Sequence, residues 1–123
     1  MSKLMAENLK FAPDAKVSFA RGTGTDVAQA ITLHKVMGDI TSSTANLGAD
    51  TSETISLTNR HIKANSMVMA MVSGGGTGVP VVSKVLPAAG SCTFLVRNIN
   101  AGTACDAVYR IRFLVIGDQS QEP

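Results

Sequence analysis

Few residues in this 123-residue chain have types and spacings that could carry chemistry, and the glycine-rich run 74–78 is the first of them. A phosphate-binding loop needs a helix after it, so that backbone N–H groups and the helix dipole face the anion. The residues that follow, 79–86, read VPVVSKVL, which is typical of a strand, and no Gly-Lys-Ser/Thr triplet is present. The run therefore predicts a flexible hairpin loop.

The histidines and cysteines do not form a metal or catalytic set. His34 lies among strand-like residues and His61 in a turn, without the spaced ligands that zinc requires, so both are expected at the surface. Cys92 falls in an alternating apolar stretch, which favours a small buried residue. A disulfide to Cys105 stays open, because strands near 91–98 and 106–117 could form a hairpin. We expect two free thiols, no metal and no cofactor.

The last candidates for a binding or catalytic site are charged residues. Arg97, Arg110 and Arg112 could form a basic patch across the same hairpin, but a net charge of +2 favours a solvated or subunit-facing stripe over nucleic acid. Paired acids for glycoside hydrolysis stay open from spacing alone, although there is no Trp to form a sugar platform. The sequence therefore predicts no catalytic residue and no enzymatic activity. The acids considered are Asp39, Asp50, Glu53, Asp106 and Asp118.

The strongest strand signal is the stretch 106–117, DAVYRIRFLVIG. Alternate residues of an extended chain point to opposite sides. One side is wholly apolar, and the other is half apolar and carries two arginines, as expected for a core face and a wet or partner-facing side. The first side holds Tyr109, Ile111, Phe113 and Val115, and the second holds Val108, Arg110, Arg112 and Leu114.

Strand signals recur about every dozen residues along the chain from Val27. With turn residues between them and no long helical pattern, they predict an all-β, β-sandwich or jelly-roll-like domain. The run 66–73 is apolar on both faces, with Met67, Met69 and Met71 on one of them, as in a central strand or an oligomer contact. The predicted strands are 30–37 with a continuation at 40–43 past a bulge, 53–59, 66–73, 79–86, 91–98 and 106–117.

Composition indicates that part of the surface is covered. Only 16% of residues are charged and 45% are apolar, while aromatic residues make up 4%. A small domain with few large aromatic side chains in its core often gains further stability from oligomerisation. No apolar run reaches the roughly 18 residues of a membrane helix, and the first residues lack a secretory signal pattern. We therefore expect cytoplasmic synthesis, no membrane partner and a subunit contact.

The first 26 residues differ from the rest. They carry large apolar side chains without a sustained period of two, and the link at 21–25, RGTGT, is turn-prone. This predicts an extended arm at 1–26, a β-domain at 27–118 and a loose tail at 119–123; an edge strand on the same domain stays open for the first segment. The side chains expected to contact a partner are Leu4, Leu9, Phe11, Val17 and Phe19.

The order of phrases in residues 30–117 resembles small structural proteins of tailed bacteriophages. A strand ending in Thr-Asn is followed by IKANS, an apolar strand, a glycine-rich loop, GVPVV, AAGS, NINAG and a final strand. The resemblance implies a virion protein, either a capsid decoration (cement) protein or a fibre or spike domain, commonly trimeric. Its implied partners are the major capsid protein and further copies of itself, and it transfers no catalytic residue.

A short arm with one compact domain favours decoration, with a fibre or spike domain that binds a host surface as the alternative. A small hydrolase is a third and weaker reading. A decoration protein would sit on the virion surface and stabilise the shell by bridging capsomers. The residues predicted to form the subunit contact are Met67, Met69, Met71, Arg110 and Arg112.

Overall fold

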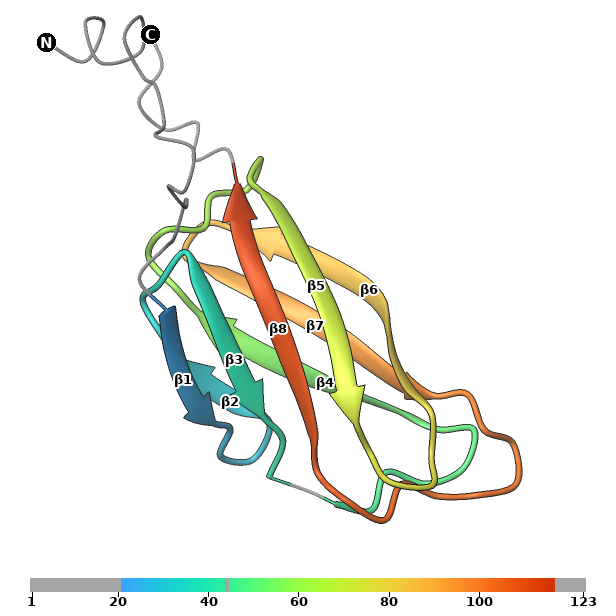
Figure 1. Ribbon diagram of the computed structural model, residues 1–123. Coiled ribbons are helices and arrows are strands. Elements are labelled where there is room, and N and C mark those ends of the chain that lie inside the picture. Colours follow the sequence, from blue (N-terminus) through green and yellow to red (C-terminus); the bar gives the residue numbers. More distant parts are fainter. Residues whose placement is uncertain (1–20, 44, 117–123) are drawn as a thin grey trace, which may run out of the picture.

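The computed structural model describes residues 21–43 and 45–116, which form two facing four-stranded sheets (Figure 1). The described residues contain no helix, so the all-β prediction is confirmed. In the front sheet of Figure 1 the order is β1 (Arg21–Thr25), β3 (Met37–Thr41), β8 (Tyr109–Ile116) and β5 (Met67–Gly74). In the rear sheet it is β2 (Ala30–Thr32), β4 (Ser52–Thr58), β7 (Ser91–Asn98) and β6 (Pro80–Ala88).

Both sheets are mixed. The pairs β1–β3 and β2–β4 are parallel. The pairs β3–β8, β5–β8, β4–β7 and β6–β7 are antiparallel. An antiparallel jelly roll would contain no parallel pair. The two-sheet arrangement is therefore established, and the jelly-roll comparison stays a prediction.

The core lies between the central strands β8 and β7. The alternation predicted for 106–117 is confirmed, because Tyr109, Ile111, Phe113 and Val115 are buried while Arg110 and Arg112 are exposed. From the rear sheet, every second residue of β7 is buried in the same way. The rings of Phe94 and Phe113 join the two layers with their centroids 6.3 Å apart. These side chains supply the apolar burial that favours the sandwich.

The prediction of a flexible link at 21–25 is wrong, because these residues form β1 and pair with β3. The single strand predicted at 30–37 is also wrong: β2 belongs to the rear sheet and Met37 begins β3 in the front sheet. The segment between them crosses from one layer to the other. A Cβ on Gly22 would lie 2.7 Å from Lys35 Cγ and 2.8 Å from Leu33 Cδ1, so the glycine makes room for this crossing.

Three further expectations need correction. β5 is an edge strand rather than a central one, although Val68, Ala70 and Val72 on its inner side do pack against the core. The run 74–78 joins β5 to β6 in the other sheet and is not a hairpin. β7 and β8 also lie in different sheets, so the hairpin expected between them is absent. In each case the strands themselves agree with the structure. Which strand pairs with which does not follow from the alternation of residues within one strand.

The predictions for the chain ends lie outside the described residues: most of the arm, at 1–20, and the tail at 119–123. The β-domain itself includes residues from Arg21, earlier than the boundary predicted at Val27. Within the described residues, no helix of the length and apolarity needed to span a membrane is found.

Candidate functional site

The outer face of the front sheet carries an exposed apolar surface. On β5, Met67 is 61% exposed and Met69 and Met71 are each 55% exposed. The register with β8 places Met67 opposite Ile116 and Met69 opposite Leu114, and Leu114 in turn faces Met37 on β3. These six residues form a continuous patch, which we call the methionine face. Contiguous apolar surface of this kind marks contact sites on soluble proteins.

The methionine face surrounds a hollow of about 410 Å³. Its floor includes Gly38 and Ala70, and Met69, Met71 and Leu114 stand around it. Small residues at the floor and unbranched methionines at the rim give a surface that can adapt its shape to an inserted side chain. The hollow is therefore suited to apolar contact.

Charged residues border the methionine face on one side. Asp39 on β3 accepts a hydrogen bond from Arg21 at 2.7 Å and lies 3.6 Å from Nε of Arg112. The hydrogen bond to Asp39, followed by its negative charge, raises the pKa of Arg21. Arg110 has no ion pair with any described residue. Three arginines against one aspartate leave this border with a net charge of +2.

The outer face of the rear sheet has a different character. Hydroxyl side chains occupy the four outward positions of β4 and the first two of β7. The third outward position of β7 is Leu95, and Leu86 on β6 is 43% exposed opposite Thr93. Arg97 forms an ion pair on this face with Asp50. Hydroxyl groups can stay in contact with water without a cost in free energy, whereas exposed methionine side chains carry such a cost. The front face is the more apolar of the two, and we therefore take it as the candidate contact surface. The outward hydroxyl residues are Ser52, Thr54, Ser56, Thr58, Ser91 and Thr93.

The structure brings together all five residues predicted for the subunit contact. Met71 lies opposite Arg112, and Ser73 lies opposite Arg110, so β5 and β8 present them on one face. Sequence reasoning did not place Met37 and Asp39 on this face, because it ended a single strand 30–37 at Met37, where β3 begins. Arg97 lies on the other sheet, so the three-arginine patch is not formed. The predicted arm contacts Leu4, Leu9, Phe11, Val17 and Phe19 fall outside the described residues.

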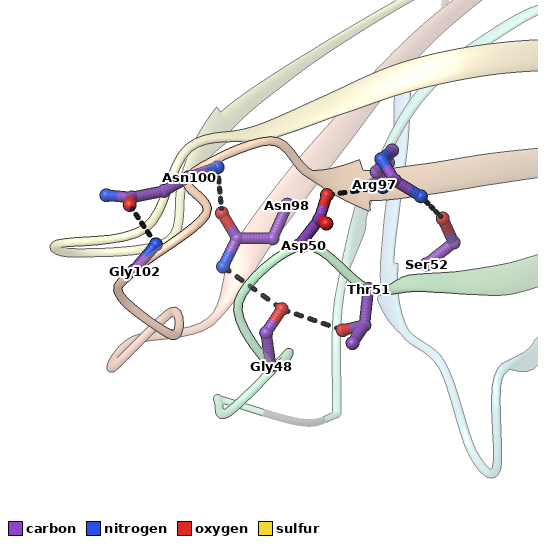
Figure 2. Close-up of polar contacts among 8 residues, drawn as sticks. All are labelled: Gly48, Asp50, Thr51, Ser52, Arg97, Asn98, Asn100 and Gly102. Atoms are coloured by element: carbon purple, nitrogen blue, oxygen red, sulfur yellow. Dashed lines mark hydrogen bonds and ion pairs between the residues drawn. The ribbon is translucent and has the colours of Figure 1, made fainter.

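A second ordered region lies where the loops meet at one end of the sandwich (Figure 2). Asn98 ends β7 and is fully buried. Its side-chain NH₂ donates to the carbonyl oxygens of Leu47 at 3.2 Å, Gly48 at 3.3 Å and Thr103 at 2.9 Å. Its Oδ1 accepts the N–H groups of residues 79 and 100, each at 3.0 Å. One side chain therefore ties three loops together.

The 74–78 run is held rather than flexible. Gly74, Gly75 and Gly76 all have positive φ, and the N–H of Thr77 donates to Asp106 Oδ1 at 2.9 Å. β6 follows the run, so it has no helix dipole. The negative carboxylate of Asp106 already occupies a backbone donor that an anion would need. The region acts as a structural connection between the sheets.

We expect Gly78→Ala to lower the free energy of unfolding by about 2–3 kcal/mol, because the added Cβ meets backbone as well as a side chain. It would lie 2.5 Å from Cys105 Sγ and 2.8 Å from the Cα and N of that residue. Gly102→Ala is the matched control, since nothing lies within 4 Å of its Cβ. Urea unfolding of both variants measures the difference in their free energies of unfolding. Equal values would show that this loop accommodates the added methyl group at little cost.

The remaining candidate side chains are His34 and Tyr109, and each makes a separate hydrogen bond. His34 Nδ1 accepts the N–H of Arg60 at 3.0 Å, and among the described residues no group of three or more His, Cys, Asp or Glu could hold a metal. Tyr109 donates its hydroxyl to Glu53. Burial, then this hydrogen bond and the charge of Glu53, raise the pKa of Tyr109.

Both cysteines are free and buried, so the expectation of two free thiols is confirmed. Cys92 occupies the predicted core position, whereas Cys105 is a buried loop residue. Burial raises the pKa of Cys92 to about 11. Burial, followed by the charges of Asp106 and Glu53, also raises the pKa of Cys105. A thiol held protonated is a poor nucleophile.

Searches of protein-family models, curated proteins and solved structures found no match to this chain.

Proposed function

We propose that this chain is a non-enzymatic structural protein of a tailed-phage virion, which decorates the capsid and stabilises the shell by bridging capsomers. The observation that carries the proposal is the methionine face, an apolar contact surface on a small β-domain. The resemblance of residues 30–117 to small structural proteins of tailed bacteriophages supplies the virion context. The protein would be made in the host cytoplasm and act on the capsid surface, with the major capsid protein as its partner.

The proposed mechanism is stabilisation by mass action. A protein that binds the assembled shell and not its separated subunits lowers the free energy of the shell in proportion to RT ln(1 + [L]/Kd). Each decorating unit must bury apolar area on more than one capsomer to act as a bridge. Specific interfaces of this kind bury roughly 800 Å² on each partner.

In this proposal the methionine face forms a subunit contact of a homotrimer, with Met67, Met69 and Met71 at its centre. Methionines 55–61% exposed in the single chain are the side chains that gain most from cover. Arg110 and Arg112 border the same face and would set the orientation of the neighbouring copy. The arm side chains Leu4, Leu9, Phe11, Val17 and Phe19 are proposed to contact the shell.

Deleting residues 1–20 tests the arm, because β1 begins at Arg21 and stays intact. We expect the thermal transition of the shortened protein to change little, since both described sheets and the buried residues between them, Ile40 to Val115, stay in the chain. Binding to undecorated capsids, measured by co-sedimentation, should fall at least tenfold. Full affinity after the deletion would show that the loops or the methionine face bind the shell instead.

The number of copies per virion, measured by mass-resolved analysis of purified particles, tests the function itself. Decoration requires many copies, one set at each equivalent shell site. A handful of copies per particle would contradict decoration and support the fibre or spike alternative.

A further inference from the structure

We propose that the free edge of β5 pairs with β5 of a second copy, antiparallel and about a two-fold axis at Ala70. The pairing would join two front sheets into one continuous eight-stranded sheet. This goes beyond the proposed trimer, because it uses the edge of the sheet rather than its face. Four observations on the described residues support it.

The first observation is that β5 is the one unguarded sheet edge among the described strands. An open edge presents unpaired N–H and C=O groups, and natural proteins block such edges with proline, charge, bulges or short length. β6 carries Pro80, Lys84 and Pro87, with a register shift between residues 82 and 84. β2 has three residues and β1 has five. β5 has eight residues and no charge, proline or register shift.

The second observation is that the side chains of β5 are nearly palindromic. The run MVMAMVS, from Met67 to Ser73, reads almost the same in both directions about Ala70. An isologous two-fold contact places residue i against j and j against i, so it requires this kind of self-complementarity. Pairing centred on Ala70 puts Met69 opposite Met71 of the second copy and Val68 opposite Val72.

The third observation concerns where those side chains point. Met69 and Met71 lie on the exposed outer face, while Val68 and Val72 pack inward against the core. In the paired sheet the methionines would cluster side by side on the outer face. The valines would extend the inner apolar layer across the junction. Cross-strand apolar pairs of this kind are the main stabilising unit of a sheet.

The fourth observation is electrostatic. β5 carries no charge, and the first charged side chains met across the register of the front sheet are the arginines of β8, one strand further in. In the paired sheet, each row of side chains across the strands would pass from one copy to the other. The row that holds Arg112 and Met71 of one copy would continue with Met69, Leu114 and Met37 of the second copy. Like charges of the two copies would be about three strand spacings apart, or roughly 14 Å. That exceeds the screening length of about 8 Å at physiological salt, so the pairing brings no repulsion.

The edge and the face together define the assembly. If the methionine face closes a trimer and the β5 edge forms a two-fold pair, the full chain forms six-chain particles. If the edge acts alone, the protein is a dimer. Light scattering or native mass spectrometry of the full chain at micromolar concentration should therefore find six or two chains. Trimers alone would overturn the edge proposal and leave the proposed trimer standing, whereas monomers alone would overturn both.

A pair of charge variants tests the register. The double substitution M69E/M71E places like charges opposite one another across the two-fold, whereas M69K/M71E places opposite charges there. Both variants remove the same two methionines and both put a glutamate beside Arg112, so any loss at the face affects them alike. We expect M69E/M71E to associate through the edge at least tenfold more weakly than M69K/M71E at low salt. Equal association of the two variants would overturn the proposal.

Ala70→Cys gives a second test that does not depend on charge. Residues directly opposite in an antiparallel pair have Cα atoms about 4.5–5.5 Å apart, within disulfide range. Mild oxidation should then produce a covalent dimer, while Cys92 and Cys105 are buried and stay free. Thr93→Cys, on the outer face of the rear sheet, is the control. A cross-linking rate for Ala70→Cys no higher than the control rate would overturn the two-fold at Ala70.

Discussion

Asn98→Ala should lower the free energy of unfolding by about 3–4 kcal/mol, among the largest effects of a single substitution in this chain. For a domain of this size that corresponds to a fall of roughly 15 °C in the midpoint of thermal unfolding. Urea unfolding followed by circular dichroism measures the free energy, and calorimetry the midpoint.

The reason is the number of backbone groups that depend on this amide. Asn98 is fully buried and bonds three carbonyl oxygens and two N–H groups from separate loops. A buried polar group that loses its partner costs roughly 1–3 kcal/mol, and water entering from the loop end recovers part of that. Asn98→Asp should be about as damaging, because a carboxylate would face three carbonyl oxygens without a donor.

Asn100→Ala is the matched control two residues away. Its side chain accepts the N–H of Gly102 at 3.0 Å (Figure 2). It also donates to Thr77 O at 3.4 Å, and both hydrogen bonds are exposed. We expect a loss below about 1 kcal/mol. If the two substitutions cost the same, the loops are held by other contacts and the central position of Asn98 is wrong.

Local alternation was enough to predict most strands. The pattern in 106–117 placed Tyr109, Ile111 and Phe113 in the core, and the pattern in 91–98 placed Cys92 there. Side-chain direction in a strand has a period of two, so burial on one face is written directly into the sequence. This is why the all-β class and the buried faces of β7 and β8 agree with the structure.

Partner choice was not predictable in the same way. The sequence between Ala30 and Met37 looks like one strand, but it contributes to both sheets, and the glycines of β1 looked like a link. Gly22 is needed because Leu33 and Lys35 approach it across the layer, which is a contact between segments. Such close approaches depend on the assembled fold, and no local pattern reports them.

The candidate site was predictable in part. Three methionines at alternate positions, beside a strand with two outward arginines, indicated a contact surface before their pairing was known. Met37, Asp39 and the hollow depend on β3 lying beside β8, a non-local pairing. Asn98 gave only the turn-like phrase NINAG, because the loops it joins are distant in sequence.

Alkaline pH should destabilise this protein steeply between about pH 9 and 11. The pKa of Cys92 is raised from an ordinary 9.0 to about 11, and the pKa values of Cys105 and Tyr109 are also raised. Groups with a raised folded pKa hold their protons in the native state after the unfolded chain has lost them. Their contribution to stability is therefore complete below pH 9 and is lost as pH rises toward the folded pKa.

The slope follows from the number of groups. Each contributes about 1.4 kcal/mol per pH unit while the unfolded group is ionised and the folded one is not. The cysteines begin near pH 9 and Tyr109 near pH 10, the ordinary values of these groups. Together they should remove roughly 4 kcal/mol or more by pH 11, a large part of the stability of a small domain. Urea unfolding in the presence of a reductant, at pH 7, 9, 10 and 11, measures the curve.

Cys92→Ala isolates the contribution of this one thiol to the loss of stability at alkaline pH. The variant should be somewhat less stable at pH 7, because it leaves a small cavity in the core. Between pH 9 and 11 its stability should fall less steeply than that of the parent, by about 1.4 kcal/mol per pH unit. A thiol reagent should find two thiols per chain only after unfolding, since both are buried. Parallel pH curves for parent and variant would mean that the Cys92 thiol ionises as easily in the fold as outside it, and that water reaches the core between β7 and β8.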